Sequence, residues 1–504
     1  MSRTKLFATN SFVSALQQMI LLLYAFIVPR ILITVYGSEI NGLVVSLTQF
    51  VQYFLLVEAG ISGASIYALY KPLAENNIIK RNAILSAAHK FYFKSGYIFI
   101  LLVVLLALIY PFILKQSSLN YWQITLIVLA LGVNGVMDFF TLAKYRVLLT
   151  ADQRAYVISF AQIVYYTIST VIVFISAKLS FNIVLLECLL IISVFVRSFI
   201  LWKYTNSHYK ELNYKEKPDD ESLKERWNVF YLQILGSAQN ALPIILATIY
   251  VSLKEVSVFS VYNLVIAGIG GILSVFISGL AASFGDVIAR GQNKTLQKAN
   301  QEFEQSYYML ITIVYSVTLL LILPFVKLYT KGVSDINYIL PLFAFMITLN
   351  GFLYNLKTPQ GMLVISAGLY RQTRWQTTTQ ALIAFLGGII GGYFWGLYGI
   401  IGGLILSNIY RDIDLYFFIP KHVTKLHHKY TLKHLLPAFI IFTCAIFIFF
   451  ISNIIINSVL SWILWGCILT FIFIIITIFL NLCFDKQNMK NIFKRIYNLL
   501  KKKI

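Results

Sequence analysis

The sequence has few charged residues and no long polar segment, and these two shortages exclude a water-soluble protein. Charged residues make up only 12% of the 504 residues, whereas hydrophobic residues make up 59%. The apolar share of a soluble globular protein is nearer ~45–50%. The polar stretches that remain are too short for a large domain outside the membrane. The chain is therefore predicted to be an all-α polytopic membrane protein.

Cysteine pairs and nucleotide-binding motifs are also missing. The four cysteines lie in apolar segments without paired spacing, so neither a disulfide framework nor a metal site is predicted. No Gly-x-x-x-x-Gly-Lys-[Ser/Thr] sequence occurs, and the chain is not expected to hydrolyse ATP. We therefore expect no cofactor beyond a coupling ion. The predicted external connections are short, which weighs against a membrane glycosyltransferase or polymerase.

The net charge of +21 is unevenly distributed along the chain. Most of the 41 Lys and Arg residues lie in every second connection between apolar segments, counted from the N-terminus. This is the positive-inside pattern, and it predicts that both termini lie in the cytoplasm. No folded basic face with interleaved aromatic residues exists outside the membrane segments, so nucleic acid is not an expected partner.

Apolar runs bounded by charge or turn residues predict fourteen membrane spans. Their approximate limits are 8–35, 40–70, 93–114, 122–147, 155–177, 181–203, 229–251, 256–289, 304–328, 336–365, 374–395, 397–419, 434–456 and 459–483.

Two polar connections divide these spans into groups. Residues 1–204 are predicted to form an N-lobe of six helices, 205–228 a cytoplasmic linker, and 229–420 a C-lobe of six more. Residues 421–504 hold a final helix pair and a basic cytoplasmic tail. Because six is even, both lobes would have the same orientation and be related by an axis along the membrane normal. Chance alignment of apolar helices is the alternative.

Arg30 lies deep in the first apolar segment, directly after Pro29. A cation at the bilayer centre costs about 2.5–3.5 kcal/mol on insertion scales. No acidic residue stands three or four positions away from Arg30 to offset this cost. A water-filled cavity would do so, since Arg30 could stay hydrated there and meet an anionic substrate. Pro29 removes one backbone hydrogen bond and favours a kink at this point.

Three further cations are candidate substrate contacts: Arg290, Lys357 and Arg411. Each also has a structural alternative. Arg290 and Lys357 lie near predicted cytoplasmic ends, where they can anchor the topology. Arg290 can pair with Asp286 at i,i+4 spacing, and Arg411 has Asp412 and Asp414 beside it.

Three acidic residues are candidates for coupling transport to H⁺ or Na⁺: Glu58, Asp138 and Glu187. A carboxyl group at low dielectric can load and release a proton near neutral pH. Each could instead be the salt-bridge partner of Arg30.

The histidines and the glycine-rich runs suggest no further chemistry. All six histidines lie in or beside predicted cytoplasmic loops, so a buried histidine relay is not expected. The runs Gly268–Gly271, Gly387–Gly392 and Gly399–Gly403 lie in apolar segments, where close helix packing or hinges explain them better than phosphate binding.

Several blocks of the sequence resemble Wzx-type polysaccharide flippases. The first and more specific set is Pro29-Arg30-Ile31-Leu32, Tyr36-Gly37-Ser38-Glu39-Ile40-Asn41-Gly42-Leu43, Leu56-Val57-Glu58-Ala59-Gly60 and Leu69-Tyr70-Lys71-Pro72-Leu73. The second set is Lys357-Thr358-Pro359, Ser366–Arg374, Gly399–Gly403 and Tyr410-Arg411-Asp412. The resemblance extends over nearly the whole chain up to residue 419.

These flippases belong to the multidrug/oligosaccharidyl-lipid/polysaccharide superfamily, together with MurJ and the MATE exporters. The resemblance implies two six-helix lobes around a V-shaped cavity, and a final helix pair beside a groove for a polyprenyl tail. MurJ-like cavities carry cations on three helices. Arg30 matches the first of these, and Arg290 lies at the end of the corresponding helix, but the segment 40–70 has no internal cation before Lys71. This difference favours a saccharide longer than that of lipid II.

The sequence is thus interpreted as a non-enzymatic flippase of a bacterial cytoplasmic membrane. By resemblance, its substrate is an undecaprenyl-pyrophosphate-linked oligosaccharide repeat unit for capsule, O-antigen or exopolysaccharide, moved from the inner to the outer leaflet by alternating access. Membrane lipids, a polysaccharide polymerase and assembly proteins are the implied partners. A cation-coupled MATE-type exporter of small molecules is the main alternative, and a membrane glycosyltransferase the lesser one.

Overall fold

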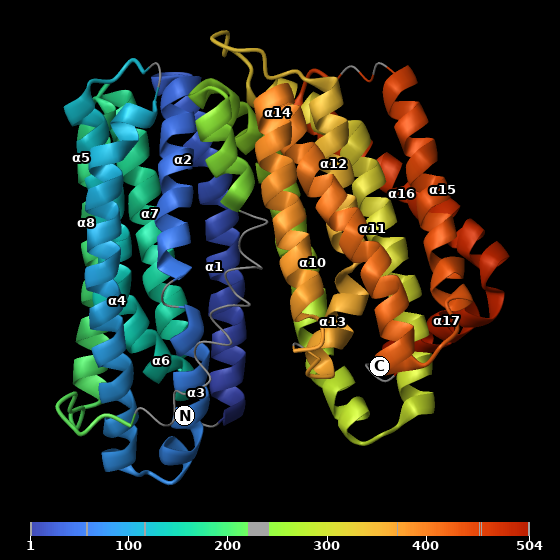
Figure 1. The fold of residues 1–504 in the computed structure, drawn as a ribbon, viewed down its shortest axis with the longest axis horizontal. Coiled ribbons are helices and arrows are strands. Elements are labelled where there is room, and N and C mark those ends of the chain that lie inside the picture. Colours follow the sequence, from blue (N-terminus) through green and yellow to red (C-terminus); the bar gives the residue numbers. More distant parts are fainter. Residues whose placement is uncertain are drawn as a thin grey trace. The chain divides into compact units, whose positions relative to one another are not determined.

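A computed structural model describes residues 3–56, 59–114, 117–219, 241–369, 371–452, 454 and 456–501. Within these ranges the chain is helical and forms no β-strand (Figure 1). Ten of the described helices are long and apolar enough to cross a membrane. The predicted all-α, multi-pass membrane fold is confirmed.

The chain divides into two compact units, Met1–Ser257 and Val258–Ile504. The first unit contains α1 (Arg3–Ile31), the π-helical turn η1 (Leu32–Tyr36), α2 (Ser38–Leu55), α3 (Ala59–Ala74), α4 (Ile78–Ile113), α5 (Tyr121–Met137), the π-helical turn η3 (Asp138–Leu142), α6 (Ala143–Ala151), α7 (Ala155–Lys178) and α8 (Ile183–His208). A short apolar helix, Ala241–Tyr250, also belongs to it.

The second unit begins within α10 (Leu253–Ala289) and continues with α11 (Asn293–Tyr329), α12 (Pro341–Leu356), α13 (Thr358–Ser366), α14 (Arg374–Ile419), the π-helical turn η5 (Pro420–Thr424), α15 (Lys429–Ile451), α16 (Val459–Phe484) and α17 (Lys486–Lys501). Both α15 and α16 pack against α11. The Trp462 indole of α16, for example, donates to the Leu321 carbonyl of α11 at 3.1 Å. The predicted lobe boundaries at 204, 228 and 420 stay predictions, and so does the V-shaped cavity.

Breaks within predicted spans are the main departures from the sequence pattern. The predicted span 40–70 forms two helices, α2 and α3, and residues 57–58 between them lie outside the described part. The predicted span 336–365 is interrupted at Lys357, between α12 and α13.

The helix α14 contains the two predicted spans 374–395 and 397–419. Only Gly396 within it leaves the helical region, with φ 57° and ψ −134°. Such a positive φ is favoured by glycine, which has no Cβ. The glycine runs on either side of the turn then pack closely, since an added Cβ at Gly399 would lie 1.9 Å from the Gly391 carbonyl oxygen. The close packing expected for these two runs is confirmed.

The third glycine run does not pack closely. At Gly268, Gly270 and Gly271 an added Cβ would meet none of the described atoms within 4 Å. The close-packing interpretation is therefore wrong for these three positions of α10.

Candidate functional site

A polar cavity of about 380 Å³ lies inside the first unit, among the helices α1, α2, α5, α7 and α8. Most of its wall is apolar, as expected within a membrane helix bundle. Its polar wall residues include Tyr24, Asn134, Asp138, Tyr165, Glu187 and Arg197.

Arg197 and Asp138 form an ion pair at this cavity. The Arg197 side chain is 4% exposed and that of Asp138 is 19% exposed. Arg197 also donates from Nη2 to Asn134 Oδ1 at 3.0 Å, and its guanidinium lies 5.0 Å from the centre of the Tyr165 ring. A buried charge needs a partner and further hydrogen bonds to offset its desolvation. This arrangement supplies both.

The backbone positions Asp138 through a local change of helix type. Asp138 is the first residue of η3, the π-helical turn between α5 and α6. The Thr141 hydroxyl donates back to the Met137 carbonyl at 2.5 Å, and π-helical turns inside α-helices are frequent at functional sites. Gly135, one turn before η3, lets α5 approach Phe99 of α4, whose ring would lie 2.2 Å from an added Cβ.

Glu187 lines the same cavity from α8, at 3% exposure. Ten residues separate it from Arg197, which is about 15 Å along an α-helix. Within the described part of the chain, no hydrogen bond or ion pair joins its carboxyl group to another residue. The rings of Tyr24 and Tyr166, also on the cavity wall, lie 5.1 Å apart. An acidic group placed in this way can hold a proton or a small cation.

The cavity thus brings together two of the three predicted coupling residues, Asp138 and Glu187. The third, Glu58, lies outside the described residues. Arg197 was not predicted, because it lies near the end of the predicted span 181–203, next to the cations of the following connection. Its position on the same face of α8 as Glu187 is the signal that could have identified it.

Arg30 lies on a different face of α1. The residues of α1 that line the cavity are Leu21, Tyr24 and Val28, and Leu32 of η1 follows them. At about 100° per residue, Arg30 lies on the opposite side of the helix from Leu21. After Pro29 the chain enters η1, where the Thr34 hydroxyl donates to the Arg30 carbonyl at 2.8 Å. The predicted disturbance at Pro29 therefore takes the form of a wider helical turn.

Arg290 follows the end of α10 and pairs with Asp286 at 2.9 Å. Both side chains are exposed, at 64% and 58%. The predicted i,i+4 pair is present, and an exposed pair of this kind contributes little to stability.

The other two predicted cations lie close to each other in the second unit. Lys357, at the break between α12 and α13, donates to Asn408 Oδ1 at 2.5 Å. Arg411 lies one turn after Asn408 in α14 and pairs with Asp414 at 2.6 Å. The ion cluster expected around Arg411 is present, and its Asp412 interacts electrostatically with Lys357.

A second cavity, of about 480 Å³, lies in the second unit between α11 and the connection from α15 to α16. Its wall is mainly apolar and contains one cation, Lys327. The representative apolar residues are Leu320 and Leu323 of α11, Phe449 and Phe450 of α15, and Ile454 and Ile456 of the connection.

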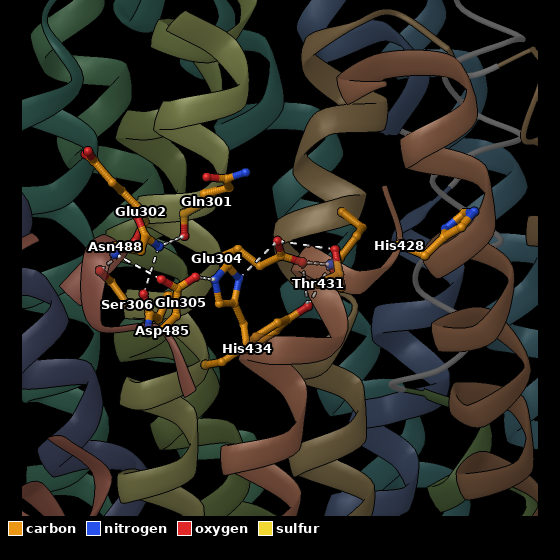
Figure 2. A network of polar contacts seen from close by, with 12 residues as sticks. Gln301, Glu302, Glu304, Gln305, Ser306, His428, Thr431, His434, Asp485 and Asn488 are labelled. Carbon is orange, nitrogen blue, oxygen red and sulfur yellow. Dashed lines mark hydrogen bonds and ion pairs between the residues drawn. The ribbon is translucent and has the colours of Figure 1, made fainter. Parts of the chain in front are cut away.

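His434 differs from the expectation for the histidines, because it is only 1% exposed. Its ring nitrogens lie 3.6 Å from Glu304 Oε2 and 3.6 Å from Asp485 Oδ2 (Figure 2). Glu304 also accepts a hydrogen bond from Gln360 Nε2 at 2.7 Å. This network joins α11, α13, α15 and the junction between α16 and α17.

Solved structures of two kinds of transporter resemble this chain. The lipid II flippase MurJ in an inward closed conformation superposes with a TM-score of 0.69 and 14% identity, covering 92% of this chain and 97% of MurJ. The chain has the MurJ and MATE fold. A multidrug resistance MATE transporter in an inward-facing conformation gives a TM-score of 0.61 at 14% identity, covering 85% of this chain and 98% of that one. The MATE multidrug transporter DinF-BH gives 0.61 at 13% identity, covering 84% and 98%.

Neither a protein-family model nor a curated protein matches the sequence. At 14% identity the superposition on MurJ shows a shared fold.

Proposed function

We propose that this protein is a flippase that carries undecaprenyl-pyrophosphate-linked oligosaccharide repeat units across a bacterial cytoplasmic membrane. The observation that carries the proposal is the agreement with the MurJ fold over 92% of the chain. The two MATE structures named above cover less, 85% and 84%, with lower TM-scores. The larger MurJ match favours a lipid-linked substrate, and the resemblance to Wzx-type flippases favours a polysaccharide repeat unit.

In this proposal, Arg30 binds the pyrophosphate or an acidic sugar. An arginine can contact two phosphate oxygens at once, which suits a doubly charged group. Arg290 and Lys357 attract the headgroup, while Arg411 is held by Asp414 and contributes at most through its charge. The apolar cavity beside α11 and α15 has a volume of about 480 Å³, which is enough to hold part of a polyprenyl chain.

Energy for transport comes from H⁺ or Na⁺ bound at the cavity of the first unit. Glu187 is the ion-binding residue, and the Arg197–Asp138 ion pair lies at the other end of the same cavity. Alternating access then couples the ion to the lipid-linked substrate. Membrane lipids surround the protein, and a polymerase and assembly proteins would receive the product.

Reconstituted liposomes test this proposal directly. The probe is a fluorescent lipid-linked oligosaccharide, whose arrival in the outer leaflet is measured with a membrane-impermeant quencher. We expect an imposed H⁺ or Na⁺ gradient to accelerate transport, and Glu187→Gln to remove this acceleration. The matched control Glu75→Gln changes an exposed carboxylate paired with Lys71 and should leave the gradient effect intact.

The anion site is tested in the same assay. Arg30→Gln should lower the transport rate at least tenfold, since a charged hydrogen bond contributes about 1.5–3 kcal/mol. Arg371→Gln removes an exposed arginine and should have little effect. Full transport by Arg30→Gln at normal protein levels would refute the role of Arg30.

A MATE-type exporter of small molecules is the second candidate. Two acids of the first unit favour it, because Asp138 and Glu187 line one cavity there. Gradient-driven release of an organic cation, without movement of the lipid-linked oligosaccharide, would establish it in place of the flippase.

A further inference from the structure

The last helix, α17, begins directly after a membrane span. Only Asp485 separates it from α16, a helix of 26 residues that is long and apolar enough to cross a membrane. The 16 residues of α17 include four lysines and an arginine, so this helix cannot cross the bilayer itself. It must therefore lie at or near a membrane surface.

The sequence of α17 is amphipathic and carries charge of one sign only. Between Lys486 and Lys501 there is no Asp or Glu. Lys486, Lys490 and Lys494 recur at i, i+4 and i+8, which places them in one stripe along the helix. Phe493 and Tyr497, at i and i+4, form a second stripe next to the lysines.

The polar network of Figure 2 determines which side of α17 faces the protein. Asn488 is buried, and its Nδ2 donates to Gln305 Oε1 of α11 at 2.7 Å. Arg495, two turns further along α17, pairs with Glu302 of α11 at 2.8 Å. The sides of α17 that carry Asn488 and Arg495 are thus occupied by contacts with α11.

Asp485 fixes where the helix begins. Its Oδ1 accepts a hydrogen bond from the backbone N–H of Asn488 at 3.0 Å, as an N-cap residue does. Its other oxygen lies 3.6 Å from His434 Nε2. Interaction with His434 is the main reason that the pKa of Asp485 lies below its ordinary value. A helix fixed at its start and along one side cannot rotate freely.

The lysine and aromatic stripes point away from these contacts. Lys486, Lys490 and Lys494 are exposed, and the exposed fractions of Phe493 and Tyr497 are 44% and 64%. Rings at this exposure beside a row of lysines match the two parts of a membrane surface. The rings suit the boundary between headgroups and acyl chains, and the lysines suit anionic headgroups.

We propose that this face of α17 binds a surface of anionic phospholipid, with Lys486, Lys490 and Lys494 on the headgroups and the rings of Phe493 and Tyr497 inserted between them. The helix then holds the C-terminal end of the chain on the bilayer. A lipid surface is favoured over a protein partner because the face adjoins a membrane span and carries no acidic residue. This binding does not depend on which substrate the protein transports.

The test uses the full-length protein in nanodiscs with an NBD fluorophore at position 497. The four native cysteines are replaced by serine, and Tyr497→Cys carries the label. Nanodiscs contain phosphatidylcholine alone, or equal parts of phosphatidylcholine and phosphatidylglycerol. We expect blue-shifted emission and protection from aqueous iodide only with phosphatidylglycerol. Both effects should be lost at about 1 M salt, where the Debye length is only about 3 Å.

The decisive variant replaces Lys486, Lys490 and Lys494 by glutamine. Each lysine near an anionic surface favours binding by about fivefold, so the three together should change the ratio of bound to detached helix on the order of 100-fold. The matched control replaces three exposed lysines of the 205–219 segment by glutamine: Lys210, Lys215 and Lys217. It removes the same charge and should keep the full blue shift.

Two outcomes would overturn the proposal. One is emission that is the same in both lipid mixtures. The other is a blue shift in phosphatidylcholine alone after inorganic phosphate is added, which would assign the lysines to a soluble anion. The label reports only the environment of position 497. Gel filtration is therefore run on each variant to distinguish a folded protein with an unbound α17 from an unfolded one.

Discussion

Replacing His434 by leucine should detach the C-terminal helices α15 to α17 from α11 more easily. In the network of Figure 2, His434 lies between two carboxylates, those of Glu304 and Asp485. Leucine has a similar volume but cannot offset either charge. The variant therefore removes the ring nitrogen that lies 3.6 Å from the carboxylate of Glu304, a residue only 1% exposed.

The magnitude follows from the burial of the two acids. Removing one partner of a buried ion pair costs about 3–5 kcal/mol, because the remaining charge stays desolvated. The Asp485 side chain is 16% exposed and can regain some hydration, whereas that of Glu304 is 2% exposed and cannot. We therefore expect the lower end, about 3 kcal/mol, which is roughly a 150-fold change in the local opening equilibrium.

Amide hydrogen exchange read by mass spectrometry measures this opening. Peptides that cover the first turns of α15 and the start of α17 should exchange about 100-fold faster in His434→Leu, while peptides of α7 keep their rates. The control His427→Leu changes an exposed histidine of the loop before α15 and should stay within about 0.5 kcal/mol of the wild type.

A second variant separates charge from packing. In His434→Leu/Glu304→Gln the buried carboxylate becomes an amide, which can still accept the hydrogen bond from Gln360. Neutralising both partners of a buried pair is often close to neutral for stability. The reasoning is refuted if the double variant opens as readily as His434→Leu, or if His434→Leu exchanges like the wild type.

Two further predictions concern the polar cavity and the α14 turn. Arg197→Met should lower the free energy of unfolding by about 3–5 kcal/mol, since it leaves Asp138 unpaired, and Arg197→Met/Asp138→Asn should recover most of this loss in a detergent unfolding assay. A single variant as stable as the wild type would show that the pair is not needed. Gly399→Ala should lower the free energy of unfolding by about 1–3 kcal/mol, because the new Cβ meets the Gly391 backbone. Gly268→Ala has open space around the new Cβ, and its better helix propensity should raise the free energy of unfolding by about 1 kcal/mol. Equal effects of the two alanines on the melting temperature would contradict this.

The spans were predictable because the hydrophobic effect acts on long stretches of sequence. Apolar segments predicted the order and type of the helices that the structure describes, and even the turn at Gly396 was anticipated as a boundary between two spans. Helix ends were less predictable. The helix α4 starts at Ile78, well before the apolar run at 93, because Asn77 caps it by accepting from the Lys80 N–H at 2.9 Å.

Only some residues of the candidate site could be predicted from the sequence. Asp138 and Glu187 could be identified because an acid within an apolar run is costly wherever it points. Their common cavity could not, since it depends on which helices are neighbours. Arg197 and His434 were missed because each lies near the end of an apolar run, where hydration would make its charge inexpensive. Only the fold shows that both are buried beside carboxylates.

The two acids of the polar cavity differ in their contacts. Asp138 has a guanidinium partner, so loading it with a proton would require breaking a buried ion pair. Glu187, at the other end of the same cavity, has no such partner within the described chain, and binding a proton or Na⁺ there breaks no existing contact. The coupling ion proposed above would enter and leave in every transport cycle, and this needs a group that can gain and lose it at comparable cost. If transport is ion-coupled as proposed, Glu187 is therefore the first residue to test, whereas Asp138 is held in its ion pair with Arg197.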